Sequence, residues 1–121
     1  IGTISFTERD TTLGTPGVAN GTSANPGITG IGSAAGNIVI SGLANDNSGA
    51  DTTAGGTVFT NGDIEDVNAD SDFNFQYQTA SGSSTDVAWT NANSGQGWGA
   101  SGLAVKGAGG GGGNVIAWIT A

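Results

Sequence analysis

The clearest alternation of apolar and polar residues lies at residues 72–79, which read D-F-N-F-Q-Y-Q-T. Side chains of an extended strand point to opposite faces in turn, so Phe73, Phe75 and Tyr77 share one face and the amides share the other. The rings give their face a large apolar area, whereas the amides tolerate water. The pattern predicts a half-buried β-strand with its aromatic face in the core. The other residues predicted for that core are Ile38, Ile40, Val58, Val87 and Val115.

Short apolar segments separated by turn residues recur along the rest of the chain. Between two of them lies Asn61-Gly62, the dipeptide that best accepts the positive φ angles of a two-residue hairpin turn. About eight strands and no helical periodicity predict an all-β fold, a two-sheet sandwich of jelly-roll or Greek-key type. Besides 72–79, the predicted strands are 1–7, 37–43, 56–60, 63–67, 85–90, 101–106 and 114–120.

The first third of the chain is predicted to lie outside the body of the fold. Residues 1–7 offer Ile4 and Phe6 on one face of a short strand, and 11–36 are mostly Gly, Pro, Asn, Ser and Thr without periodicity. We therefore expect an extended N-terminal arm and linker at 1–36. A β-sandwich body is predicted at 37–121, within a chain whose 121 residues are enough for one core.

Charge is scarce and one-sided. Charged residues are 10% of the chain, Gly reaches 24 residues, and ten acids against two bases give a net charge of -8. This charge repels phosphate backbones and anionic lipid headgroups, so we expect no nucleic acid and no membrane surface as partners. The sequence also lacks an apolar run of roughly 20 residues, so no membrane insertion is expected.

Export is expected from the N-terminal residue and from the absence of Met. The chain opens on Ile1 and contains no Met, which predicts that a leader has been removed and that the protein is extracellular or at the cell surface. It also contains no Cys, so disulfides cannot stabilise it. Its stability must come from packing, from a metal or from neighbouring chains.

The inventory of reactive side chains argues against an enzyme. Without His or Cys the chain lacks the commonest general base, the thiol nucleophile and the commonest transition-metal ligands. The glycine run 109–113 is followed by Asn114 and a predicted strand, so it is not a phosphate loop. A glycosidase with paired carboxylates is the one class that the composition permits, but five of the ten acids fall within 63–72 and no cleft is predicted.

An acidic turn is the candidate metal site. Its oxygen-bearing residues have the two-residue spacing of the first calcium ligands in an EF-hand loop, although the motif's later Gly and Glu are missing and no helix flanks it. Calcium is therefore a possible cofactor, with a solvated acidic turn as the alternative. A second turn at 45–51 has similar spacing and the same alternative. The candidate ligands are Asp66, Asn68, Asp70 and Asp72.

Tryptophans suggest a carbohydrate partner as another option. Trp89, Trp98 or Trp118 would stack on sugar rings as in carbohydrate-binding modules. Trp98 has glycines on both sides and is the one expected to be exposed. The alternative for Trp98 is a loop residue folded back as a lid on the core.

The apolar arm and the Gly/Asn/Thr-rich, acidic, Cys-free body resemble secreted subunits of bacterial or archaeal extracellular filaments assembled by donor-strand exchange. The resemblance implies a structural protein whose partner is another copy of itself, with Ile1, Ile4 and Phe6 at the subunit interface. Two alternatives stay open. One is a calcium-supported carbohydrate-binding module, and the other is a viral tail or capsid-surface protein.

Overall fold

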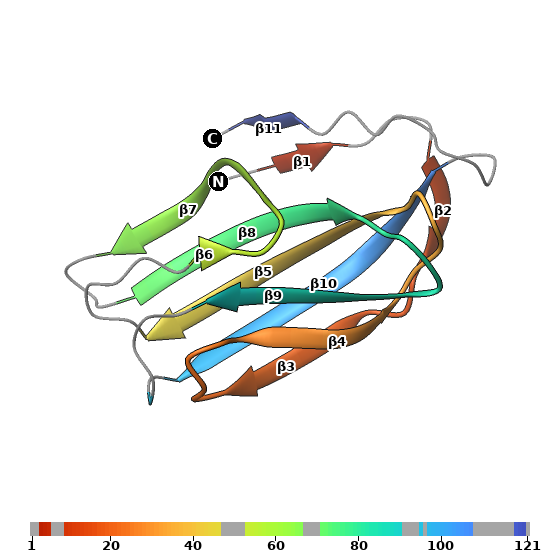
Figure 1. The fold of residues 1–121 in the computed structure, drawn as a ribbon. Helices are drawn as coiled ribbons and strands as arrows, with labels where there is room; N and C mark the ends of the chain where they lie inside the picture. Colours follow the sequence, from red (N-terminus) through yellow and green to blue (C-terminus); the bar gives the residue numbers. More distant parts are fainter. Residues whose placement is uncertain are drawn as a thin grey trace.

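The computed structural model describes residues 3–5, 9–46, 53–66, 71–90, 95, 97–107 and 118–120. Every regular element in these residues is a β-strand and none is a helix, which confirms the all-β prediction (Figure 1). The strands are β1 (Thr3–Ser5), β2 (Arg9–Leu13), β3 (Gly17–Gly21), β4 (Gly27–Gly32), β5 (Ile38–Asp46), β6 (Thr53–Ala54), β7 (Thr57–Asp66), β8 (Ser71–Thr79), β9 (Ser84–Thr90), β10 (Trp98–Gly107) and β11 (Trp118–Thr120).

The strands form two principal sheets and one short ribbon, all antiparallel. The larger sheet has the order β2–β10–β5–β8–β7, with β3 also paired to β10. Strands β2 and β3 pair with successive parts of β10, so together they make one edge of this sheet. The smaller sheet has the order β4–β9–β6, and Figure 1 shows β4 and β9 in front of the larger sheet. The ribbon is β1 paired with β11.

The hydrophobic core lies between the two principal sheets. Ile31 of β4 reaches the larger sheet because glycines face it: a Cβ atom built on Gly17 or on Gly102 would lie 2.8 Å from the Ile31 side chain. Both sheets therefore supply the buried cluster, which consists of Ile28, Ile31, Val39, Leu43, Ala80, Val87, Trp89, Ala100 and Ala104.

The predicted arm and linker contains three strands of these sheets. β2, β3 and β4 all lie within 1–36, and Ile28 and Ile31 of β4 are fully buried. The sequence pattern does not predict β4, because the register of this strand with β9 shifts between the two isoleucines, where Gly30 has a φ of 76°. Such a shift breaks the alternation by which a strand is recognised.

The predicted hairpin turn at Asn61-Gly62 is wrong, because both residues lie inside β7. Val58 pairs with Gln76 and Asp63 pairs with Asn74, so residues 59–62 lie opposite the single residue Phe75 of β8. The dipeptide that tolerates positive φ angles is thus used in a register irregularity within one strand.

The predicted facing of β8 is also wrong. Phe73 and Phe75 are 41% and 40% exposed, whereas Asn74 and Gln76 are 1% and 0% exposed. A strand has only two faces, so turning the amides inward turns the rings outward. Of the other predicted core residues, Val87 is buried, Ile38, Ile40 and Tyr77 are half-buried, Val58 lies in β7, and Val115 lies outside the described residues.

Candidate interaction surface

The inward amides of β8 hold the two sheets together through hydrogen bonds. Gln76 accepts a hydrogen bond at Oε1 from the Gly56 backbone N–H and donates one from Nε2 to the Ala88 carbonyl of β9 at 3.0 Å. The Trp89 indole Nε1 donates to Asn74 Oδ1, also at 3.0 Å. Buried polar groups are stable only when they are paired in this way. These bonds explain why the polar face of β8 lies in the interior.

The outward face of the larger sheet carries two cross-strand rows of residues. In each row a Phe of β8 is followed by two small residues, one on β5 and one on β10, and then by a residue of the edge strand β3. The rows are Phe75–Gly42–Ser101–Val18 and Phe73–Ala44–Gly99–Asn20.

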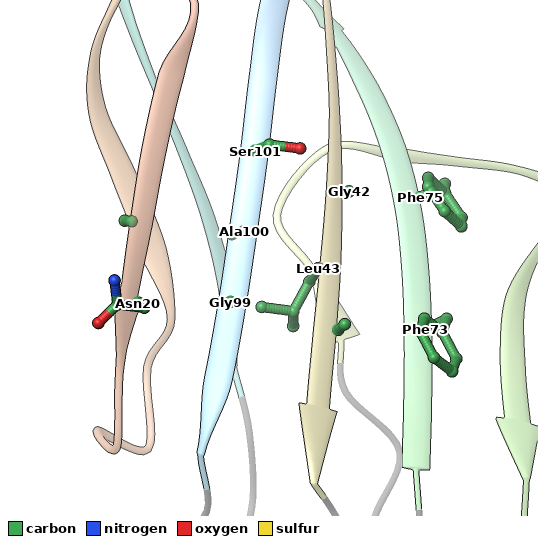
Figure 2. Close-up of a pocket in the computed structure, with 10 residues that line it drawn as sticks. Asn20, Gly42, Leu43, Phe73, Phe75, Gly99, Ala100 and Ser101 are labelled. Atoms are coloured by element: carbon green, nitrogen blue, oxygen red, sulfur yellow. The ribbon is translucent and has the colours of Figure 1, made fainter.

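Together these rows form a hollow of about 450 Å³ that is open to solvent. Figure 2 shows Phe73 and Phe75 along β8 and the small residues on the neighbouring strands. The Phe75 ring lies against Gly42, where an added Cβ would come within 2.7 Å of the ring. We call this feature the aromatic hollow. Its lining residues are Ala19, Asn20, Gly42, Leu43, Ala44, Phe73, Phe75, Gly99, Ala100 and Ser101.

Among the side chains that the structure describes, the exposed aromatic rings lie at one end of this face. Toward the other end, Val105 lies in register with Ile38 and is buried. Tyr77 and Ile40, which pair across β8 and β5, are half-buried. The aromatic hollow is therefore a local apolar surface at the end where β8 begins.

The edge next to the hollow is formed by β3, which reads G-V-A-N-G. β3 pairs with β10 over five consecutive residues without a register shift, and among the described residues it pairs with no other strand. It carries no charge and no Pro, and Val18 is 79% exposed. An edge of this kind presents unpaired backbone groups on which another strand can add.

Each of the other edges of the two principal sheets has a feature that opposes strand addition. β2 contains Arg9 and Asp10 and has a register shift. β7 contains three acids, and its register shifts after Val58. β4 has the irregularity at Gly30, and β6 is two residues long. Charges, irregularities and short length are the usual means of blocking edge-to-edge pairing, so β3 stands out.

The candidate calcium ligands are only partly described. Asp66 ends β7, and Asp72 is buried at the start of β8, whereas Asn68 and Asp70 lie outside the described residues. In the described part of the chain, no group of three or more His, Cys, Asp or Glu residues could hold a metal ion. Calcium binding at this turn remains a prediction.

The candidate interface residues of the arm have one described member. Ile4 lies in β1 opposite Ile119 of β11, in a ladder of three residue pairs. Ile1 and Phe6 fall outside the described residues.

Trp89 and Trp98 do not form an exposed platform. Trp89 is buried in the core, and Trp98 is half-buried against it. The Trp98 ring lies over Gly21, where a Cβ would come within 2.9 Å of it. Trp118 belongs to β11. Among the side chains that the structure describes, the exposed aromatics are Phe73 and Phe75, which the sequence pattern predicts to lie in the core.

A signal for part of the aromatic hollow does exist in the sequence. Gly42 and Ala44 alternate with larger residues in one apolar segment, and Gly99 lies between Trp98 and Ala100 in another. Small residues at every second position mark a strand face without the volume to fill a core. Recognising them as the neighbours of Phe73 and Phe75 requires the strand order, which the sequence does not provide.

Searches against protein-family models, curated proteins and solved structures find no match. The described residues also include no helix long and apolar enough to cross a membrane. The geometry of the edge and of the aromatic hollow is thus the basis for a functional proposal.

Proposed function

We propose that this protein is a structural subunit of an extracellular filament or surface assembly, whose copies join by donating a β-strand to one another. The observation that carries the proposal is the edge strand β3, which is uncharged, regular and, among the described residues, paired on one side only. A strand that adds to such an edge gains a row of backbone hydrogen bonds. The extracellular location follows from the resemblance in composition to secreted filament subunits.

The donor in this proposal is the N-terminal arm with Ile1, Ile4 and Phe6. Within one chain, β1 has a ladder of three pairs with β11, whereas β3 offers five residues along its edge. Exchanging the short ladder for the longer one increases the number of backbone hydrogen bonds per subunit. Five residues of strand span about 17 Å, which an extended arm of similar length can match.

We further propose that the fold is a two-sheet sandwich of jelly-roll type with eight strands. The proposal counts β2 and β3 as one strand and leaves out the β1–β11 ribbon. The orders β2/β3–β10–β5–β8 and β4–β9–β6 then support it, since each agrees with the winding of a jelly roll. One strand departs from that pattern, because β7 pairs with β8 in the larger sheet. Jelly rolls frequently serve as building blocks of assemblies.

The net charge of -8 disfavours nucleic acid as the partner. Strand addition forms backbone hydrogen bonds and does not require opposite charges. The reactive side chains give no reason to propose catalysis, since the chain has no His and no Cys.

The acceptor edge is tested by a pair of matched substitutions. Val18→Lys places a charge on β3 at an exposed position, and Leu13→Lys places the same charge on β2, where Leu13 is 57% exposed. Both variants should fold, because neither side chain is in the core. Electron microscopy should show filaments for the wild type and for Leu13→Lys, and none for Val18→Lys. Filaments of normal length from Val18→Lys would exclude β3 as the acceptor.

The donor is tested by removing residues 1–7. The shortened chain should stay folded by circular dichroism but form no filaments. A synthetic peptide of residues 1–7, added to the full chain, should shorten the filaments by capping growing ends. If the shortened chain instead loses stability and still polymerises, the arm packs on its own subunit and the donor assignment fails.

A further inference from the structure

We propose that the aromatic hollow binds the aromatic hollow of a second copy of the chain, in a two-fold symmetric contact between sheet faces. This contact is distinct from strand donation, because it uses the face of the larger sheet and donation uses its edge. It goes beyond the proposed function and does not depend on it.

Charge identifies the kind of partner. None of the ten residues that line the aromatic hollow is charged, on a chain with a net charge of -8. Asp46 is exposed beside the hollow, where it lines an adjoining depression together with Ala44, Phe73 and Gly99. Two copies repel each other wherever their acidic surfaces approach, so the uncharged lining of the aromatic hollow is where they can meet with less repulsion. A basic partner would find no carboxylate in the hollow, and an acidic partner would find no base. An uncharged apolar surface is therefore the matching occupant.

The shape of the aromatic hollow points to a second copy of the same surface as the partner. Phe73 and Phe75, which Figure 2 shows along β8, form a ridge, and the Phe75 ring rests on Gly42. Beyond this ring, Gly99 and Ser101 of β10 form a trough. A Cβ built on Gly99 would meet no atom within 4 Å, so the trough above this residue is open. A two-fold rotation places the ridge of each copy over the trough of the other, as in an isologous interface.

The polar content of the hollow disfavours a sugar as its occupant. Only Asn20 and Ser101 supply polar side chains among the lining residues. Sugar rings stack on aromatic side chains, but their many hydroxyl groups also need hydrogen-bond partners. Phe side chains offer none, whereas Tyr and Trp would. A second apolar ridge fits this lining better.

Disulfide trapping tests the contact directly, because the natural chain contains no Cys. Full chains carrying Phe73→Cys are mixed with full chains carrying Gly99→Cys under mild oxidation. The proposed contact brings these two positions together, so a cross-linked dimer of one chain of each kind should form. The control mixes Phe73→Cys with Gly82→Cys, since Gly82 also has no atom within 4 Å of a built Cβ but does not line the hollow. The yield should be about tenfold higher than in the control, because binding raises the effective thiol concentration.

A second pair of variants tests the contact without a cross-link. Gly99→Asp adds a charge within the hollow, and Gly82→Asp adds the same charge elsewhere. If the chain does not polymerise, light scattering should report dimers for the wild type and Gly82→Asp but monomers for Gly99→Asp. If it does polymerise, Gly99→Asp should give single filaments where Gly82→Asp gives laterally paired ones.

The possible outcomes separate the two proposals. Wild-type dimers without any filaments would overturn strand donation and support the face contact. Filaments of unchanged width in Gly99→Asp, with cross-linking at the control yield, would overturn the face contact and leave strand donation intact. Monomers for every variant, again with control-level cross-linking, would overturn both.

Discussion

The two faces of β8 differ in polarity, and the polar face is the one that lies inward. In most half-buried strands the apolar face lies inward. The inner face of β8 carries Asn74 and Gln76, which are buried, and its outer face carries Phe73 and Phe75, which are about two-fifths exposed. Both sets alternate along the same nine-residue strand. Hydrogen-bond partners across the core, as well as apolar area, therefore determine which face of the strand lies inward.

The partners on the inner face come from the opposite sheet and its connections. Gln76 bonds to the backbone of Gly56 and Ala88, and Asn74 bonds to the Trp89 indole. These hydrogen bonds pair the amides with polar groups of the interior. Apolar side chains at the same positions would leave those groups without these partners. The rings on the outer face have small neighbours within the sheet, so their remaining area is available to a partner.

The largest effect is expected for Trp89→Ala. Trp89 is 1% exposed and is one of the largest side chains in the core, and its loss also leaves Asn74 without the indole donor. The free energy of unfolding should fall by about 3 to 5 kcal/mol, a large part of the stability of a domain of this size. Urea denaturation of wild type and variant measures the change, and a loss below about 1 kcal/mol would contradict the assignment of Trp89 to the core.

The next effect is expected for Gln76→Ala, which removes both hydrogen bonds of a fully buried amide. The Ala88 carbonyl would keep its bond from the Gly55 N–H, whereas the Gly56 N–H would lose its Gln76 acceptor. The expected loss of stability is about 2 to 3 kcal/mol.

Gln78→Ala provides the matched control in the same strand. Gln78 donates from Nε2 to the Asp86 carbonyl in an exposed hydrogen bond, so its removal should change the free energy of unfolding by less than about 1 kcal/mol. Equal losses for the two variants would show that the inner amides of β8 do not stabilise the fold through buried hydrogen bonds.

A smaller effect is expected for Phe75→Ala on the outer face. Because Phe75 is 40% exposed, it gains only part of the roughly 1.5 to 3 kcal/mol that full burial of a Phe side chain provides. The loss should be about 1 kcal/mol. Denaturation must be measured at protein concentrations where copies do not associate, because association would add to the apparent stability. A loss of stability above about 3 kcal/mol would show that Phe75 is a core residue, as the sequence pattern predicts.

These contrasts show which parts of the structure the sequence determines by local rules. The all-β class follows from short apolar segments between turn residues, and the prediction of a strand at 72–79 is confirmed by β8. Which face of β8 lies inward depends on Gly56, Ala88 and Trp89, residues 12 or more positions away in sequence. Alternation specifies that two faces exist, but only tertiary partners decide which one is buried.

The candidate surface was harder to predict for the same reason. The exposed edge and the hollow arise where β3, β10, β5 and β8 lie side by side, although these strands are far apart in the chain. β3 itself falls within the predicted linker, since its five residues alternate only between Gly, Ala and two larger side chains. No local pattern distinguishes such a segment from a turn-rich connection.

The smallest predicted effect concerns the packing of Phe75 on Gly42. A Cβ at Gly42 would lie 2.7 Å from the Phe75 ring, so Gly42→Ala must displace the ring from the sheet surface. In the wild type this displacement should offset the usual gain from replacing a strand Gly, which is about 0.5 to 1 kcal/mol. In the Phe75→Ala background the ring is absent, and Gly42→Ala should be stabilising by that amount. A double-mutant cycle should therefore give a coupling energy of about 0.5 to 1 kcal/mol between the two positions. Additive effects would mean that the ring does not rest on Gly42 in solution, which would weaken the ridge-and-trough shape on which the face contact depends.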